Sequence, residues 1–174
     1  MGKKPEHLTA LCGDVLVSKG HPRILFRGKL DSLQAEVLLI QCEALALGAE
    51  VGFLEDLEQI LGFLREMMRC EVLELPFEAE AILGLSFDQI REQSHDPLRF
   101  FGVEAMALPD HRFGRVFALL NRLRTQVREV EVSAALAFGQ GEDMARGDLL
   151  LRGLNRLSSA VHVLMCREMG GKRP

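Results

Sequence analysis

Apolar residues recur at helical spacing along most of this 174-residue chain, and this periodicity constrains the fold more than any other feature. Four long segments place apolar side chains three or four residues apart, which puts them on one face of a helix. We expect these helices over residues 29–47, 51–73, 110–138 and 147–169. Because helices with one apolar face bury it against each other, the sequence predicts an all-α bundle.

Residues that begin or end helices stand at several of the expected boundaries. Gly48 suits the left-handed position that follows a helix. Ser86 and Gln89 have the spacing of a capping box, which predicts a short helix that ends before Pro97. Asp110 is expected to cap the long helix that runs to residue 138.

We expect a single domain over residues 1–174, with an irregular arm over 1–28 and the bundle over 29–169. No uncharged apolar run approaches the roughly 18 residues of a membrane helix. The net charge of −4 provides no basic field for nucleic acid or an anionic membrane. Without a signal peptide, the four scattered cysteines indicate reduced thiols in a cytoplasmic protein. They are Cys12, Cys42, Cys70 and Cys166.

Positive charge is concentrated in one stretch of this acidic chain. Residues 111–128 hold five arginines and no carboxylate, whereas residues 36–92 hold thirteen carboxylates and three arginines. This distribution fits a discrete anionic ligand better than a polyanion. A solvated helix face is the alternative that charge alone favours.

Two lines of polar residues flank the apolar faces of the last two long helices. The first line is Asn121, Arg124, Arg128 and Glu131. The second line is Arg152, Asn155, Ser159 and His162. Intrahelical ion pairs on two boundary faces would explain this pattern. However, Arg124 and Arg128 stand one turn apart and repel each other unless an anion lies between them, so an anion site remains the second interpretation.

Four segments in the same order resemble the ATP:corrinoid adenosyltransferases. LNRLRTQVREVE (120–131) resembles their R-T-x-x-R-R-A-E signature, and LNRLSS (154–159) resembles L-N-R-L-S-D. HPRILFRGKLDSL (21–33) is similar to their D-P-R segment, and Leu108-Pro109 stands where they have L-P-G. SHDPLRFFG (94–102) and KPEHLTAL (4–11) are closest to the ethanolamine-utilisation type.

The resemblance implies a ferritin-like, up-down bundle of four or five helices that transfers the 5′-deoxyadenosyl group of ATP to reduced cobalamin. Triphosphate would leave, with Mg²⁺ bound mainly by its oxygens and by water. The chain would form a homo-oligomer, a trimer by analogy with short relatives, with sites at subunit interfaces. A reductase and an adenosylcobalamin-dependent lyase are the implied partners, in the cytoplasm or at a microcompartment.

The resemblance also implies roles for individual residues. Arginine suits a triphosphate because its planar guanidinium binds phosphate oxygens in pairs. The implied catalytic residues are Arg128, Arg124 and Asp31, the last paired with Arg124 across a subunit boundary. The implied ATP-binding residues are Gly13, Asp14, Lys19, Arg124, Arg128, Glu131, Asn155 and Arg156. The implied corrinoid wall is Phe100, Phe101 and Met106, which ordinary core packing would explain equally well.

This sequence departs from the family pattern in several places. We expect it to lack the His/Cys-rich metal motif that ethanolamine-type relatives carry upstream of the region matching Lys4. Its phosphate loop is reduced to Cys12-Gly13-Asp14, Glu129 replaces a second arginine, and Ser159 replaces an aspartate. These changes raise the alternative of a corrinoid or nucleotide carrier or sensor without turnover.

Two further interpretations of the polar residues carry less weight. A ferritin-like two-metal centre needs two Glu-x-x-His motifs and two more glutamates, but we find only Glu92-x-x-His95. We therefore expect no metal bound by the protein. His162 fits a boundary position better than the nucleotide site, although both remain open.

Overall fold

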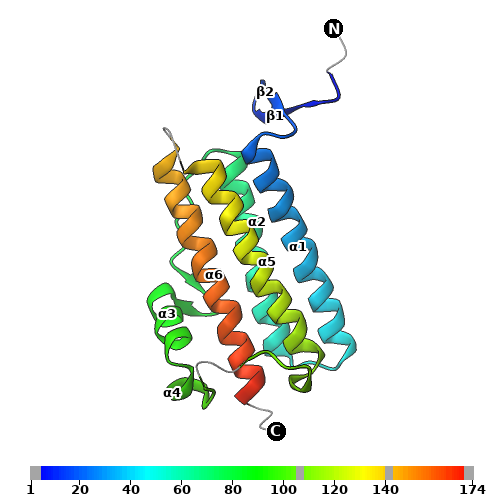
Figure 1. Ribbon diagram of the computed structural model, residues 1–174, viewed down its shortest axis with the longest axis vertical. Coiled ribbons are helices and arrows are strands. Elements are labelled where there is room, and N and C mark those ends of the chain that lie inside the picture. The colour runs from blue at the N-terminus through cyan, green and yellow to red at the C-terminus, as the bar shows by residue number, and fades with distance from the viewer. Residues whose placement is uncertain (1–4, 105–107, 140–142, 171–174) are drawn as a thin grey trace.

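The computed structural model describes residues 5–104, 108–139 and 143–170. Four long helices lie side by side and form the body of the molecule (Figure 1). They are α1 (Pro22–Ala46), α2 (Val51–Val72), α5 (Arg115–Phe138) and α6 (Met144–Gly170). The predicted all-α bundle is therefore confirmed.

The four helices form two antiparallel pairs joined by one long crossover, residues 73–114 (Figure 1). α5 packs against both α1 and α6, and α1 also packs against α2. The crossover carries β3 (Ala81–Ile82), β4 (Leu85–Ser86), α3 (Phe87–His95), α4 (Pro97–Phe101) and the 3-10 helix η1 (His111–Phe113). Both α3 and α4 lie against α6. One long crossover is the connection found in ferritin-like bundles.

The apolar faces predicted from periodicity form one core. Leu30 and Ile40 of α1, Leu123 and Val127 of α5, and Leu157 of α6 are fully buried. Leu47 was expected on the apolar face of the first predicted helix, residues 29–47, but it is exposed. It is the C-cap residue of α1, and Gly48 turns the chain there with a φ of 71°. No helix in the described part of the chain is long and apolar enough to cross a membrane.

α1 begins at Pro22, seven residues before the predicted start. His21 caps the helix by accepting a hydrogen bond at Nδ1 from the backbone N–H of Arg23, at 3.2 Å. Proline is well suited to the first turn, since its fixed φ is helical and its missing N–H has no partner there. The prediction missed this turn because Arg23 interrupts the apolar pattern, yet its side chain is buried.

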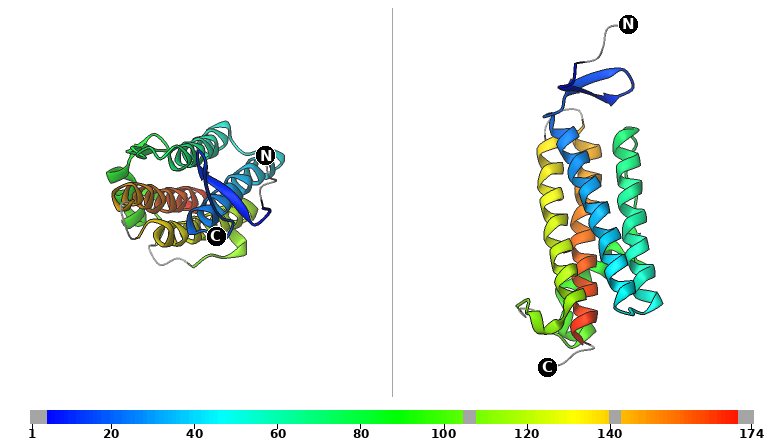
Figure 2. Two further views of the ribbon diagram at one scale, coloured as in Figure 1. Left: turned by 90° about the horizontal axis from the view of Figure 1, so that it is seen from above. Right: turned by 90° about the vertical axis from the view of Figure 1, so that its right-hand side faces the viewer.

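The arm expected to be irregular is an antiparallel hairpin of β1 (Leu8–Cys12) and β2 (Val15–Ser18). Gly13 turns the chain between the strands at a φ of 51°, which glycine adopts without strain. The hairpin projects beyond the end of the bundle where α1 starts (Figure 2). Because its strands are short and none of their residues is fully buried, they lack the alternation that reveals a strand in a sequence.

The start of α5 also differs from the prediction, whereas the capping box is confirmed. Asp110 caps η1, and α5 begins after Gly114, whose φ of 93° interrupts helical geometry. Ser86 accepts from the backbone N–H of Gln89 at 3.2 Å and donates its own N–H to the Gln89 side chain at 2.8 Å. The short helix α3 then ends at His95, as expected.

Candidate functional site

The two polar lines predicted from the sequence meet between α5 and α6, except at Arg152, which pairs with Glu80 of the crossover at 2.6 Å. Asn155 Nδ2 on α6 donates to Glu131 Oε1 on α5 at 3.2 Å. Arg124 donates to Asn121 Oδ1 at 3.3 Å. Glu131 therefore bonds across the helix pair, and neither arginine of the first line takes it as an intrahelical partner.

A small hollow opens where these lines meet the end of α3. We call it the arginine hollow, and its volume is about 200 Å³. It is lined by Ser94, His95, Arg124, Arg128, Ser158, Ser159 and His162. Its walls thus provide guanidinium, imidazole and hydroxyl groups and no carboxylate. This is the chemistry of an anion site, because every lining side chain offers hydrogen-bond donors.

Within the described residues, no carboxylate forms an ion pair with Arg124 or Arg128. Arg124 is half-buried, and its Nε is a buried donor with no hydrogen-bond partner. Burial first, and then the charge of Arg128, lowers the pKa of Arg124. Because a buried donor normally has a partner, the unpaired Nε of Arg124 makes this site suited to an anion.

His162 shares this electrostatic environment. Burial, followed by the charge of Arg124, lowers the pKa of His162 below 6.5, so the ring is neutral at pH 7. Its Nε2 lies 3.6 Å from Sγ of the buried Cys166. The sequence favoured a boundary position for His162, but the structure places it in the wall of the arginine hollow.

The structure adds three lining residues that the sequence analysis did not select. Ser94 and His95 come from the last turn of α3, and Ser158 comes from α6. His95 was considered as part of a metal motif, as a surface or capping group, and as a member of the 94–102 segment that resembles the ethanolamine-utilisation type. No signal in a single sequence predicts that the end of α3 packs against α6 beside Ser158 and His162. Within the described residues, no group of three or more His, Cys, Asp or Glu could hold a metal ion.

The predicted phosphate-loop residues do not reach the arginine hollow within this chain. Gly13, Asp14 and Lys19 belong to the hairpin, beyond the end of α5 that carries Phe138 (Figure 1). Ten residues of helix separate Arg128 from Phe138, which is about 15 Å along the axis. The chain therefore brings together the predicted arginines, while the loop stays at the far end of the bundle.

Asp31 and Arg156 also lie outside the wall of the hollow. Asp31 is exposed on α1, and no hydrogen bond or ion pair joins it to a described residue. α1 borders α5 through a different groove, lined by Lys29, Gln126 and Glu129 among others. Arg156 is half-buried on α6, also without a bonded partner among the described residues.

The predicted corrinoid wall is only partly described. Phe100 and Phe101 lie on α4, with ring centroids 6.3 Å apart. Phe100 is exposed and Arg99 stacks on its ring, whereas Phe101 packs against the core. Met106 lies outside the described residues. Neither phenylalanine lines the arginine hollow, although α4 directly follows His95 and Asp96.

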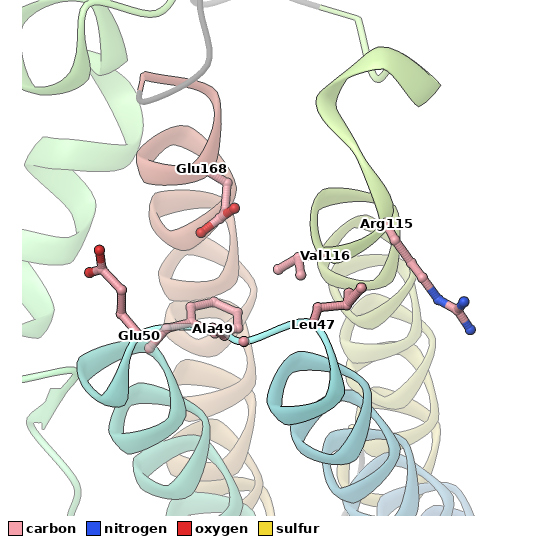
Figure 3. Close-up of a pocket in the computed structure, with 8 residues that line it drawn as sticks. Leu47, Ala49, Glu50, Arg115, Val116 and Glu168 are labelled. Carbon is pink, nitrogen blue, oxygen red and sulfur yellow. The ribbon is translucent and has the colours of Figure 1, made fainter.

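A larger hollow, of about 410 Å³, is shown in Figure 3. The elements that line it meet at the end of the bundle opposite the hairpin (Figure 1). It is lined by Leu47, Gly48, Ala49, Glu50, Phe53, Arg115, Val116 and Glu168. Arg115 points away from it and pairs with Glu43 at 3.0 Å. Because its lining combines apolar groups with two carboxylates, this hollow is a poor site for a polyphosphate despite its size.

A second pair of arginines one turn apart occurs on α1, and we call its surroundings the buried ion cluster. Arg23 donates from Nε to the fully buried Glu71 at 2.7 Å, and Arg27 bonds the same carboxylate. Arg23 also bonds Glu74 at 2.7 Å. The cluster consists of Arg23, Arg27, Glu71, Glu74, Asp143 and Arg146. Here the repulsion between two arginines is cancelled within the protein.

The comparisons with known proteins identify the family of this chain. The cobalamin adenosyltransferase family model matches residues 1–168, so the chain belongs to the cobalamin adenosyltransferase family. It is similar to the corrinoid adenosyltransferase EutT of Salmonella typhimurium, with 40% identity over 166 residues, covering 94% of this chain and 59% of the relative. EutT of Escherichia coli K12 is 40% identical over 168 residues, 95% of this chain and 60% of the relative.

The chain spans about three fifths of the length of these curated relatives. No solved structure matches it significantly. Arg124 and Arg128 stand at the two arginine positions through which the 120–131 segment resembles the family signature, and both line the hollow.

Proposed function

We propose that this chain transfers the 5′-deoxyadenosyl group of ATP to the cobalt of a reduced corrinoid and releases triphosphate. One observation carries the proposal: in a member of this family, two arginines that pair with no carboxylate of the described residues share a hollow of donor groups. Nothing in the geometry favours a carrier without turnover.

The chemistry requires charge stabilisation at the leaving group. The electron pair of Co(I) forms a bond to C5′ of ATP while the C5′–O bond breaks, and its electrons leave on the triphosphate. Arg124 and Arg128 bind the phosphate oxygens and stabilise the charge that develops there. Glu131 and Asn155 hold the nucleotide beside them, with Arg156 as a further phosphate or interface contact.

Mg²⁺ is part of the proposal as a companion of ATP. The described residues offer no cluster of three or more ligating side chains, so phosphate oxygens and water would provide its ligands. When bound, the ion offsets part of the charge of the triphosphate. Phe100, Phe101 and Met106 would form the apolar side of the corrinoid site and exclude water from it.

A second copy of this chain completes the site in our proposal. α1 and α5 border an open groove of about 390 Å³ whose wall includes the exposed Leu25, Val132 and Leu136. Exposed apolar side chains gathered along one groove are typical of an interface. A homo-oligomer, with a trimer favoured, would bring Asp31 to Arg124 and bring the hairpin residues Gly13, Asp14 and Lys19 to a neighbouring nucleotide.

The cellular setting follows the resemblance to ethanolamine-utilisation enzymes. We propose a cytoplasmic protein, associated with a microcompartment, that receives Co(I) corrinoid through a reductase and supplies an adenosylcobalamin-dependent lyase.

The test is formation of a light-sensitive cobalt–carbon bond from ATP, Mg²⁺, reductant and cobalamin. We expect Arg128→Ala to slow this reaction about 10²–10³-fold, because it removes one donor to the leaving group. Arg115→Ala, on the same helix and paired with Glu43, is the matched control and should retain activity. A fully active Arg128→Ala variant would contradict the mechanism, and a wild-type chain that binds both substrates without forming the bond would be a carrier.

A further inference from the structure

The wall of the arginine hollow contains a histidine whose chemistry the proposed function does not use. His162 is half-buried on α6 and faces a hollow that also holds His95 of α3 and two arginines of α5. One ring nitrogen, Nε2, lies 3.6 Å from Cys166 Sγ. The other, Nδ1, has no hydrogen-bond partner among the described residues.

Cys166 is the group whose contact with His162 bears on which ring nitrogen carries the proton. The thiol is 1% exposed, and burial raises its pKa to about 11, so it remains S–H at neutral pH. A thiol is a weak donor, and the ring of a neutral histidine has one acceptor nitrogen. If the S–H donates to Nε2, the ring proton stands on Nδ1, which becomes a donor.

The surroundings of His162 favour a ring that is neutral and that donates to an anion. The charged or titratable groups that line the hollow with it are Arg124, Arg128 and His95, and Cys166 lies behind it on its own helix. Burial and the charge of Arg124 oppose a charge on the ring. A neutral Nδ1–H adds a directional hydrogen bond without adding a third positive charge that would repel the other two.

We propose that His162 is a ligand-binding residue of the arginine hollow, donating its Nδ1–H to a phosphate oxygen that Arg124 and Arg128 also hold, and that Cys166 acts as a positioning residue by fixing this tautomer. The inference rests on the proposed function in taking the anion to be a polyphosphate. Nε2 of the half-buried ring faces a thiol rather than the anion, so only Nδ1 is available for this contact.

Binding of inorganic triphosphate to the full chain, measured by calorimetry, tests the role of His162. We expect His162→Leu to weaken binding about 10- to 100-fold, the usual effect of losing a hydrogen bond to a charged group. His162→Asn places an amide N–H near the position of Nδ1 and should restore much of the affinity. His162→Gln extends its amide toward the position of Nε2 and should not. Wild-type affinity in His162→Leu would overturn the proposal.

The tautomer is tested by the ¹⁵N chemical shifts of the imidazole, assigned by their loss in His162→Gln. We expect a protonated Nδ1 in the wild type, and a mixture of tautomers with severalfold weaker triphosphate binding in Cys166→Ala. Cys70→Ala, at a buried cysteine of α2, is the matched control for packing loss. It should leave the tautomer of His162 and the triphosphate affinity unchanged. A proton on Nε2 in the wild type would overturn the role of Cys166.

The outcomes also separate this inference from the proposed function. A chain that binds triphosphate through His162 but forms no cobalt–carbon bond would sustain the inference and overturn the transferase. An active transferase whose triphosphate affinity is insensitive to His162→Leu would sustain the proposed function and overturn the inference about His162.

Discussion

Two arginine pairs with the same spacing differ in their environment. Arg23 and Arg27 on α1 share the carboxylate of Glu71, which is completely buried. Arg124 and Arg128 on α5 have no carboxylate partner within the described residues. The pKa of Arg23 is raised, because its bonds to Glu74 and Glu71 outweigh the opposing effect of burial. The pKa of Arg124 is lowered, because burial and Arg128 act in the same direction.

This difference distinguishes a structural ion cluster from a binding site. In the buried ion cluster, the charges are satisfied before any ligand arrives, so their role is to join the start of α1 to the end of α2. In the arginine hollow, no described carboxylate offsets the two positive charges, and in our proposal an anion would do so. The same residue spacing therefore forms part of an ion cluster in one place and, in our proposal, part of a binding site in the other.

The largest expected effect concerns the buried ion cluster. Glu71→Gln leaves Arg23 and Arg27 without their shared carboxylate, and we expect it to lower the free energy of unfolding by about 3–5 kcal/mol. Chemical denaturation measures this change. Glu92→Gln, which removes an exposed ion pair with Arg99, is the control and should cost at most about 1 kcal/mol. If the two variants lost equal amounts of unfolding free energy, Glu71 would not be the shared structural partner of Arg23 and Arg27.

The second effect concerns the arginine hollow and its missing anion. Inorganic triphosphate at one hundred times its Kd should stabilise the folded chain by about 2.7 kcal/mol, which thermal unfolding would detect. Salt should weaken the effect because this site is open to solvent. We expect the stabilisation to be largely lost in Arg128→Ala and kept in Arg115→Ala. A similar shift in both variants would place the anion elsewhere.

A charge reversal compares the two pairs directly. Arg128→Glu replaces a repulsion on α5 with an attraction to Arg124, so the free energy of unfolding should rise by about 0.5–1 kcal/mol while triphosphate binding is lost. Arg27→Glu, at the equivalent position of the α1 pair, should destabilise the chain, since it places a second carboxylate beside Glu71. Urea unfolding of both variants gives the comparison, and a destabilised Arg128→Glu would show that an unseen partner already neutralises the α5 pair.

The smallest effect is on the titration of His162. Its pKa in the folded chain is below 6.5, so the unfolded chain takes up this proton more readily and stability falls as the pH drops below about 6.5. Arg124→Met should raise the pKa of His162 in part, since burial, the larger cause, remains. The free energy of unfolding that Arg124→Met loses between pH 7.5 and 5.5 should then be smaller than the loss in the wild type. Proton NMR titration of the ring measures the pKa, and an unchanged value would remove Arg124 as a cause.

The helical architecture was predictable because its signals are local. The buried positions of α5 and α6, such as Leu123 and Leu157, follow from spacing alone, and Ser86 and Gln89 cap α3 through contacts three residues apart. The hairpin and the start of α1 were not predicted. The hairpin strands bury little, and Arg23 looks polar in the sequence although Glu71, 48 residues away, makes its burial favourable.

For the candidate site, the sequence was sufficient to select Arg124 and Arg128 and to suggest an anion between them, because like charges one turn apart are unfavourable in any helix. It could not reveal that the α1 pair has a buried carboxylate and the α5 pair has none, nor that Ser94, His95 and His162 share one wall. Those facts depend on which helices pack together and on their relative positions along the bundle axis. Only the tertiary structure decides this, since Coulomb energy and hydrogen bonding depend on distance in space and not on separation along the chain.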